Sequence, residues 1–525
     1  MVEQLKIPEE VRRVVLVLHE AGYEAYPVGG CVRDLLLARR SLGEGGPKDW
    51  DVATSAKPEE ILQLFPESFY ENAFLTVTVN TGSDDPTLAE IEITTFRSEG
   101  KYTDKRHPDD VRYAQTLEED LSRRDFTMNA MALKIDVSSP QKRGSSADKN
   151  WIPDQVGNDN QDLDLQIVDP FNGQSDIEKK IIRAVGDPDK RFNEDALRML
   201  RAVRFGVQLG FAIEPATRDA IKRNAGSIHF IAKERIRDEL LKIFETPHAR
   251  DSIELLHELG LLKHIMPELE DGIGIVNRPK ILTVWEHNLK SLEYGAKSGY
   301  PPLICLAALL HDVGKPATRG PVNTKNDEWT FYGHDVVGAK IATRILERLH
   351  FPRHDIEKIA TLIRWHLFKY DPDEGITDSS IRRLIRHVGA DNMDNLVKLR
   401  ICDRMGMGVP KALPYRLRHF QFRVEKILRE EEAPSVKKIA IKGEDIMKIL
   451  SIPPGPKIGA VLEVLLQEII DDPEKNEREY LMARIAELRE LSEQELADIA
   501  HAAESKIELA EDERIGAMKG KYWVK

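Results

Sequence analysis

The spacing of apolar residues changes once along this 525-residue chain, and that change limits the folds it can adopt. In the first part, short runs rich in β-branched residues predict strands, at Phe74–Thr81, Glu90–Phe96 and Asn129–Ile135. After Phe171, apolar residues recur with helical spacing almost to the C-terminus, as in residues 193–209, 215–224, 232–244 and 249–262. We therefore expect an α+β protein: an N-terminal head with a mixed β-sheet and helices, followed by an all-helical remainder.

Changes in composition divide the chain further. Residues 138–164 are polar and lack periodicity, so we predict a disordered insertion there. A second break, at residues 318–327, interrupts a helical unit, and a proline-rich turn at 452–456 precedes the last helices. The predicted segments are a head at 1–137, the insertion at 138–164, a helical segment at 165–280, a second one at 281–435 and a helical tail at 436–525.

Composition excludes several classes of protein. The apolar run Pro301–Leu310 is too short to span a membrane and is bounded by His311-Asp312, so it predicts a buried helix. The apolar stretch at the N-terminus carries Glu and Arg, which is not typical of a signal peptide. The three cysteines are far apart, which excludes a disulfide framework or a cysteine zinc site. We expect a soluble, cytoplasmic protein without a membrane partner.

The net charge is −13, yet basic residues gather in two stretches. Residues 179–204 hold eight Lys and Arg against four Asp and Glu, and residues 381–423 hold ten against three. Such stretches could bind a polyanion while the rest of the chain stays acidic. On charge alone, solvated helix faces are the favoured interpretation.

The head contains a pair of carboxylates preceded by a glycine turn. Asp49 and Asp51 are one residue apart, so on a strand both side chains would point the same way, as Mg²⁺ ligands must. Twenty residues earlier, Gly29-Gly30 join a short predicted strand to a predicted helix at residues 31–40. Two glycines let the backbone approach a phosphate, and Arg33 can add charge-assisted contacts. A strand, a glycine turn, a helix and a D-x-D strand in this order indicate a nucleotidyltransferase.

Four motifs occur in order at suitable spacings: Gly29-Gly30-x-Val32-Arg33-Asp34, Asp49-x-Asp51, RRDFTMNA at residues 123–130, and Glu194-Asp195-x-x-Arg198. Together they resemble the class II tRNA nucleotidyltransferase and bacterial poly(A) polymerase family. The resemblance runs from about Tyr26 to Phe244 and, less specifically, to the C-terminus. It makes residues 165–280 a neck that recognises the base and binds RNA.

The resemblance implies where the substrates would be held. Asp49 and Asp51 would hold two Mg²⁺ ions, one lowering the pKa of the RNA 3′-hydroxyl and the other stabilising the triphosphate and the departing pyrophosphate. A third metal carboxylate is not evident, and Glu92 is a candidate whose simpler interpretation is a strand-surface residue. The implied nucleotide-binding residues are Gly29, Gly30 and Arg33 for phosphate, and Arg123, Arg124 and Asp125 for ribose and phosphate.

In the predicted neck, Asp195, Arg198, Arg201 and Arg204 recur at every third position of a helical stretch and would lie along one ridge. Without the resemblance, an exposed salt-bridged helix is the favoured interpretation. The resemblance makes Asp195 and Arg198 a base-reading pair. A carboxylate acceptor beside a guanidinium donor matches the edges of cytosine and adenine, whereas uracil and guanine present the reverse order. Arg201 and Arg204 would contact the triphosphate or support the pair.

The second helical segment carries imidazoles and carboxylates spread over several predicted helices, and such groups can converge on a metal. Their order, with His311-Asp312 at the centre, resembles the HD phosphohydrolase superfamily. The resemblance implies a site for a divalent metal, left open among Mn²⁺, Ni²⁺, Co²⁺ and Mg²⁺, and a phosphomonoester or cyclic phosphodiester substrate. A purely structural domain is the alternative. The implied ligands are His287, His311, Asp312, His334, His366 and Asp403.

Together these resemblances imply an enzyme that adds C, C and A to the tRNA 3′ end from CTP and ATP without a template. The stretch from Thr95 through Tyr102, Asp104, Arg106 and Pro108 resembles a flexible loop that favours addition of all three nucleotides. A poly(A) polymerase and an enzyme adding only CC or only A remain alternatives. An HD phosphohydrolase with an RNA-binding N-terminal module is an alternative of another class. The sequence does not give the oligomeric state.

Overall fold

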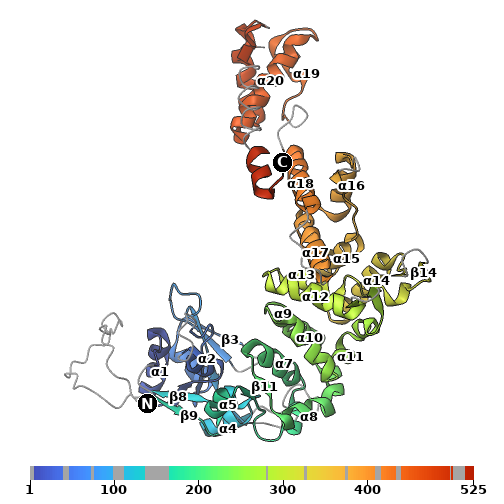
Figure 1. Cartoon of the computed structure of the whole chain (residues 1–525). Helices are drawn as coiled ribbons and strands as arrows, with labels where there is room; N and C mark the ends of the chain where they lie inside the picture. The colour runs from blue at the N-terminus through green and yellow to red at the C-terminus, as the bar shows by residue number, and fades with distance from the viewer. Residues whose placement is uncertain are drawn as a thin grey trace, which may run out of the picture.

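The computed structural model describes residues 5–38, 46–71, 76–98, 112–135, 165–278, 282–323, 328–372, 376–407, 415–432, 439–492, 494–496, 498–499 and 515–524. These residues form a head and a long helical arm that curves away from it (Figure 1). Strands gather in the first part and helices dominate the rest, so the predicted α+β class is confirmed. The predicted insertion at 138–164 and the loop residues Tyr102, Asp104, Arg106 and Pro108 lie outside the described residues.

The head is built on a five-stranded sheet in the order β1-β2-β5-β4-β3. Strand β2 pairs with β5 in parallel, and the other neighbouring pairs are antiparallel. The predicted strand at 74–81 is β4, and the one at 90–96 is β5. The head elements are α1 (Glu9–Glu20), β1 (Ala25–Pro27), α2 (Gly30–Ala38), β2 (Asp51–Thr54), α3 (Pro58–Leu64), β3 (Ser68–Glu71), β4 (Thr76–Asn80), β5 (Glu90–Thr95), β6 (Arg97–Ser98), β7 (Arg112–Tyr113) and α4 (Leu117–Ser122).

Alternation along β5 separates the two faces of this sheet. Ile91 and Ile93 are fully buried and join the main hydrophobic core with Val52 of β2. Glu90 and Glu92, between and beside them, are exposed on the opposite face. Because successive side chains of a strand point to opposite faces, the sheet gives its apolar face to the core and leaves its polar face for a site.

A two-stranded hairpin lies beside the five-stranded sheet and completes the head. Strand β8 (Ala132–Ile135) pairs antiparallel with β9 (Leu165–Val168), and an isolated bridge joins Val28 to Ala132. The predicted strand at 129–135 begins too early, because residues 127–129 form a 3₁₀ turn, η1 (Thr127–Asn129).

Deleting residues 138–164 and closing the chain with a short turn is expected to leave the fold intact. Ile135 and Leu165 are Cα partners across the hairpin, so the described residues on either side of the deletion already lie side by side. The length of a loop changes its closure entropy by only about 0.6 kcal/mol per doubling, so a shortening by two to three halvings should change the free energy of unfolding by about 1–2 kcal/mol. Thermal denaturation of the deletion variant measures this. Loss of soluble protein would mean that the segment contributes an ordered element.

The helices after the hairpin form the start of the arm. The predicted single helix at 193–209 is wrong, because α6 ends at Glu194 and α7 begins at Leu197. Asp195 between them is extended, and its Oδ1 accepts a hydrogen bond of 3.0 Å from the backbone N–H of Leu197, which satisfies a free donor at the start of α7. The elements are α5 (Gly173–Lys179), β10 (Ile181–Ile182), α6 (Pro188–Glu194), α7 (Leu197–Leu209), β11 (Ala212–Ile213), α8 (Pro215–Asn224), α9 (Lys233–Phe244), α10 (Ala249–Glu258) and α11 (Leu262–Ile265).

The middle of the arm packs around α13, an apolar helix with seven buried residues, as the run Pro301–Leu310 predicted. The predicted break at 318–327 lies at a small hairpin of β14 and β15. The elements are β12 (Val276–Arg278), β13 (Leu282–Thr283), α12 (Val284–Lys297), α13 (Pro302–Leu310), β14 (Val322–Asn323), β15 (Glu328–Trp329), α14 (His334–Arg348), α15 (Arg353–Trp365), α16 (Asp378–Val388), α17 (Met393–Gly406) and α18 (Tyr415–Glu432).

The last helices, α19 (Gly443–Leu450), α20 (Pro456–Asp471) and α21 (Arg478–Glu487), lie at the end of the arm farthest from the head (Figure 1). They have a hydrophobic core of their own, separate from the main core that runs from the head to Ile427. Within the described ranges, no helix is both long enough and apolar enough to cross a membrane.

Candidate active sites

The glycine turn of the head is shaped by an arginine. Gly29 has φ +78°, a conformation that side chains rarely adopt, and a Cβ there would lie 2.5 Å from Nη1 of Arg124. Its N–H donates to the carbonyl of Met131 and that of Val28 donates to Asp51, so the turn is tied to both neighbouring strands. Glycine at position 29 therefore lets Arg124 lie against the turn. The sequence suggested a different reason for glycine here, namely that the backbone can approach a phosphate.

The two carboxylates of the D-x-D motif lie at the start of β2. The prediction that both are strand residues is half right, because β2 begins at Asp51 and Asp49 lies in the bend before it. Trp50 between them is buried, and both carboxylates line one cavity of about 1040 Å³. Burial raises the pKa of Asp51; Arg124 and Arg201 lower it and Asp49 raises it further, and the net shift is upward.

Glu92 lies beside these carboxylates. It is the Cα partner of Asp51 on the adjacent parallel strand, so the two side chains share a face of the sheet. Glu92 is exposed there and lines the same cavity. Glu92 is thus a residue on the surface of a strand, in agreement with the simpler of its two interpretations. The surface on which it lies forms part of the cavity wall.

A chain of hydrogen bonds connects Arg33 to the neck. Arg33 donates to Asn129 Oδ1 (2.8 Å), Asn129 donates to Asp125 Oδ1 (3.1 Å), and Arg201 donates to Asp125 Oδ2 (2.8 Å). Burial would raise the pKa of Asp125, but Arg201 and Asn129 lower it to about 2. Asp125 is therefore ionised and holds Arg201 in place.

Arg123 and Arg124 are both anchored by Asp120, which is buried and accepts from both guanidinium groups. Sequence reasoning missed Asp120. The available signal was its position three and four residues before the two arginines, a spacing at which side chains meet if the segment is helical, as it is in α4.

The predicted base-reading residues line a second cavity, of about 380 Å³. Within it, Asp195 accepts two hydrogen bonds from Arg235 of α9, at 3.3 and 2.8 Å. Arg198 donates to Glu194 at 2.7 Å and to the backbone carbonyl of Arg123 at 2.8 Å. Each member of the pair is thus held by a different partner, and Arg235 is a further lining residue that the sequence did not point to.

The two remaining arginines of the ridge lie against one aromatic ring, and so does Arg33 of the head. Arg33, Arg201 and Arg204 lie over Phe205 with guanidinium-to-centroid distances of 5.1, 5.1 and 4.2 Å. Arg204 also pairs with buried Glu239 at 2.7 Å. The two cavities share Asp51, Glu92, Arg124, Asp125 and Arg201, so the carboxylates of the head and the predicted base-reading residues face one continuous site.

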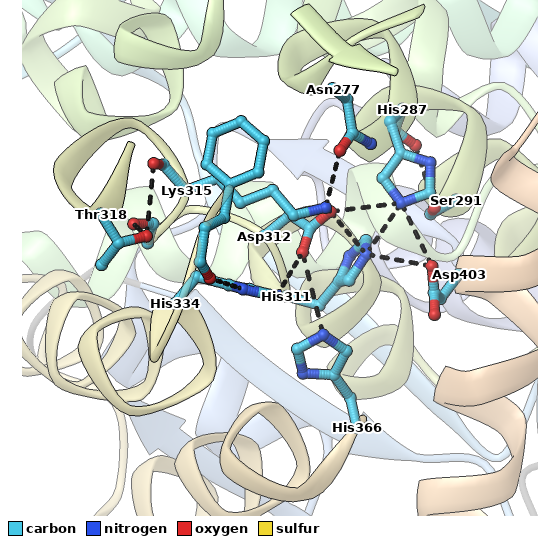
Figure 2. A network of polar contacts seen from close by, with 12 residues as sticks. Asn277, His287, Ser291, His311, Asp312, Lys315, Thr318, His334, His366 and Asp403 are labelled. Carbon is cyan, nitrogen blue, oxygen red and sulfur yellow. Dashed lines mark hydrogen bonds and ion pairs between the residues drawn. The ribbon is translucent and has the colours of Figure 1, made fainter. Parts of the chain in front are cut away.

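A second cluster lies in the middle of the arm, where the six predicted ligands come together (Figure 2). The Nε2 atoms of His287, His311 and His334 lie 3.4, 3.4 and 3.3 Å from the carboxylate of Asp312. Asp403 Oδ1 lies 3.3 Å from His287 Nε2. The six residues therefore lie in one cluster, and their role as metal ligands stays a prediction.

The orientation of the imidazoles suits a cation. His311, His334 and His366 each place Nδ1 2.6 to 2.8 Å from a backbone carbonyl, so Nδ1 carries the proton and Nε2 presents a lone pair to the cluster. His334 Nε2 is buried, and it lies 3.3 Å from Asp312 Oδ1 without the geometry of a hydrogen bond. Two sets of possible metal ligands share Asp312: His287 with His311, and His334 with His366. Facing lone pairs and carboxylates repel one another unless a positive charge lies between them, so this donor set fits a divalent metal.

Neighbouring charges hold the carboxylates of the cluster ionised. Burial would raise the pKa of Asp312, but Lys315 and the imidazoles keep it well below the usual range. Arg400 donates to Asp403 Oδ2 at 2.6 Å and acts in the same direction. Burial and His311 lower the pKa of His366 to about 4, so this imidazole is neutral, as a metal ligand must be.

The close packing of this cluster depends on two glycines. A Cβ on Gly314, in the HDVGK stretch, would lie 2.3 Å from the backbone carbonyl of His334, and one on Gly406 would lie 2.1 Å from the hydroxyl of Ser291. These contacts bring α14 and α17 against the helices that carry His311 and His287.

Three parts of the chain match known family models. Residues 25–183 match the poly(A) polymerase head domain, 210–273 the probable RNA and SrmB-binding site of polymerase A, and 284–405 the HD domain. Domains of the first and third kinds depend on divalent cations, in agreement with the donor groups described above.

Two curated proteins and one solved structure resemble the chain over much of its length. A CCA-adding enzyme of Geobacillus sp. (strain WCH70) is 30% identical over 475 residues, 89% of this chain and 94% of that protein. An A-adding tRNA nucleotidyltransferase of Deinococcus radiodurans is 33% identical over 362 residues, 67% of this chain and 75% of that protein. The crystal structure of the Bacillus stearothermophilus CCA-adding enzyme in complex with CTP has a TM-score of 0.52 at 26% identity and covers 92% of this chain and 98% of that one. Together with the continuous carboxylate and arginine site of the head, these likenesses show that the chain belongs to the CCA-adding enzyme family of nucleotidyltransferases.

Proposed function

We propose that this chain adds C, C and A to the 3′ end of tRNA, using CTP and ATP and no nucleic-acid template. The proposal is supported by the continuous site. Asp49 and Asp51 line one of its two cavities, Asp195 and Arg198 line the other, and the two cavities have lining residues in common. Such a site can hold the triphosphate at one end and the base at the other. Because tRNA is processed in the cytoplasm, we place the protein there.

The residues of the head have distinct roles in this proposal. Asp49 and Asp51 hold Mg²⁺, which would supply charge neutralisation at the 3′-hydroxyl and the triphosphate. The backbone of Gly29-Gly30 and the guanidinium of Arg33 bind phosphate. Arg123, Arg124 and Asp125 orient the ribose and phosphates, with Asp125 acting through Arg201, to which it is hydrogen-bonded.

Residues of the neck select the base of the incoming nucleotide. The carboxylate of Asp195 accepts from the exocyclic amino group of cytosine or adenine, and Arg198 donates to the adjacent ring nitrogen. Arg235 fixes the direction of the Asp195 carboxylate, and Glu194 does the same for Arg198. Arg201 and Arg204 support the pair or contact the triphosphate. Uracil and guanine would leave buried polar groups facing like groups, which a site built for hydrogen bonding rejects strongly.

The test supplies the protein with a tRNA that lacks its 3′ end and with each labelled nucleotide separately. Addition of C, then A, ending at three nucleotides, is expected. The likeness to an A-adding tRNA nucleotidyltransferase makes addition of A alone the second candidate function. An enzyme of that kind would use only ATP, and only on a tRNA that already ends in CC. Continued addition of A beyond the third position would indicate a poly(A) polymerase.

Replacing Asp195 with alanine is expected to weaken the use of CTP and ATP and to relax the rejection of UTP. A bidentate base contact is worth about 1–3 kcal/mol, so the CTP/UTP preference should fall by about 5- to 150-fold. Arg198→Ala should weaken both correct nucleotides similarly without improving UTP as much. Single-nucleotide incorporation of CTP, ATP and UTP measures both effects.

The matched control is Asp189→Ala, which removes a partly exposed carboxylate bonded to Arg223 and Asn224 outside both cavities. An exposed pair contributes under about 1 kcal/mol to stability and nothing to selectivity. If Asp195→Ala leaves the CTP/UTP ratio as unchanged as the control does, Asp195 is only a structural residue that begins α7.

We further propose that the cluster around Asp312 is a metal-dependent phosphohydrolase centre for a phosphomonoester or a cyclic phosphodiester. Its support is the convergence of imidazole lone pairs on two ionised carboxylates. Hydrolysis assays with Mn²⁺, Ni²⁺, Co²⁺ and Mg²⁺ in turn test this activity and identify the metal.

A further inference from the structure

A buried carboxylate lies outside the nucleotide site but contacts its wall. Asp120, on the buried face of α4, is only 1% exposed and lines neither of the two cavities. Burying a carboxylate is costly unless the group is paired and hydrogen-bonded. Burial would raise the pKa of Asp120, but Arg123 and Arg124 hold it below its usual value, so the carboxylate is ionised.

The groups bound to Asp120 belong to three arginines. Oδ1 accepts two hydrogen bonds from the guanidinium of Arg123, at 3.0 and 2.8 Å, and one from the backbone N–H of Arg97, at 3.2 Å. Oδ2 accepts from Nη2 of Arg124 at 3.4 Å. All three arginines line the second cavity, of about 380 Å³. One buried carboxylate therefore contacts each arginine that the described part of the head contributes to this cavity.

The side chains that Asp120 holds are separate from the contacts that read the base. Arg124 lines both cavities, and its Nη1 lies 2.5 Å from the place of a Cβ on Gly29. Arg198 donates to the backbone carbonyl of Arg123 at 2.8 Å, not to its side chain. Loss of the Asp120 carboxylate would therefore release two guanidinium groups and leave the bond from Arg198 in place.

We propose that Asp120 is a positioning residue for nucleotide addition, which orients the guanidinium groups of Arg123 and Arg124 for the phosphates of the incoming CTP or ATP. This inference rests on the transferase function proposed above and adds a residue that does not touch the nucleotide. A free arginine side chain samples many rotamers, and ordering it on binding weakens the affinity. Because Asp120 orders two arginines beforehand, every nucleotide benefits, whichever base it carries.

Calorimetric titration of the full chain, with Mg²⁺ in excess, tests this role without turnover. Asp120→Asn has almost the volume of the wild-type side chain and keeps an oxygen acceptor for the N–H of Arg97, but it loses the charge that orients the two guanidinium groups. The affinities for CTP, ATP and inorganic tripolyphosphate are expected to fall about tenfold, because hydrogen bonds to a charged group are the stronger kind. The affinity for cytidine, which has no phosphate, should stay unchanged.

Asp176→Asn is the matched control. Asp176 is 4% exposed and accepts from Thr127 at 2.7 Å and from Arg183 at 3.0 Å, outside both cavities. Both variants lose a buried carboxylate that is bonded to arginine, so both should lower the melting temperature, and only Asp120→Asn should lose affinity for tripolyphosphate. If Asp120→Asn is insoluble, Asp120→Ser takes its place, with a smaller side chain that still offers an acceptor.

A double-mutant cycle separates positioning from a merely structural role. If Asp120 acts through the two arginines, Asp120→Asn should change the affinity for tripolyphosphate by less than about twofold in a chain that already carries Arg123→Ala and Arg124→Ala. A further tenfold loss in that background would mean that Asp120 acts by another route, and the proposal would be wrong.

The binding results also distinguish this proposal from the transferase function. Equal affinity for tripolyphosphate in the wild type and in folded Asp120→Asn would overturn the positioning role, and so would an equal loss of affinity for cytidine. If the variant loses tripolyphosphate as expected but the wild type adds no nucleotide to tRNA, the positioning role stands and only the transferase function fails. A wild type that binds neither CTP nor tripolyphosphate would refute both.

Discussion

Asp49→Ala and Asp51→Ala are each expected to lower the rate of nucleotide addition at least about 1,000-fold while tRNA binding persists. Metal-based neutralisation of developing charge is worth several kcal/mol, and about 4 kcal/mol corresponds to a factor of 1,000. The carboxylates line the cavity at the start of β2, whereas contacts to RNA would come largely from the arm, so binding and chemistry should separate. Single-turnover incorporation of CTP measures the rate, and filter binding of tRNA measures the affinity.

The control for these variants is Glu59→Ala, which removes an exposed carboxylate of α3 outside both cavities. Glu92→Gln belongs in the same series, because Glu92 is the strand neighbour of Asp51. Addition close to the wild-type rate in both aspartate variants would remove the transferase assignment from this site.

His311→Ala and Asp312→Ala are expected to abolish metal-dependent hydrolysis and to lower the content of bound metal, without changing CCA addition. Both residues are fully or almost fully buried, and Asp312 belongs to both possible ligand sets, so its loss should affect the whole cluster. The two sites lie in different parts of the chain, one on the head and one in the arm (Figures 1 and 2). Metal analysis of the purified protein, hydrolysis of phosphate esters and CCA addition provide the three measurements.

His354→Ala is the matched control, because His354 is an exposed histidine of α15 outside the cluster. Retained CCA addition in His311→Ala would also show that the chain still folds after losing a buried imidazole. If the wild type neither binds nor uses Mn²⁺, Ni²⁺, Co²⁺ or Mg²⁺ at this cluster, the domain is structural.

Features that depend on neighbours in the sequence were predictable from it. The glycine turn and the apolar helix before His311 each lie within one turn or one element, so their residue types indicate their local geometry, whereas only Asp51 of the D-x-D pair lies on the predicted strand. The helix α8 lies where the periodicity placed it, the strands β4 and β5 agree to within two residues at their ends, and α10 ends four residues earlier than predicted. The limits of the five predicted segments and the roles of the site residues stay predictions.

Features that depend on packing were not predictable. The helix predicted over residues 193–209 is interrupted because Asp195 is extended and bonds to Leu197, which no periodicity reveals. The residues of the predicted ridge find their charged partners outside α7. Asp195 is bonded to Arg235 and Arg204 to Glu239, both of α9; Arg201 is bonded to Asp125 of the head, and Arg198 to Glu194 at the end of α6.

The sequence by itself therefore determined the kinds of chemical group present and the order in which they occur: carboxylates near a glycine turn, a basic neck, and imidazoles spread over helices. Only the tertiary structure decided which of them meet. Asp403 reaches His287 across 116 residues of chain, and Arg235 reaches Asp195 across 40, because helices that are distant in sequence pack side by side. Local periodicity determines which face of a helix is apolar, whereas the partner of that face is decided by the burial of apolar surface over the whole chain.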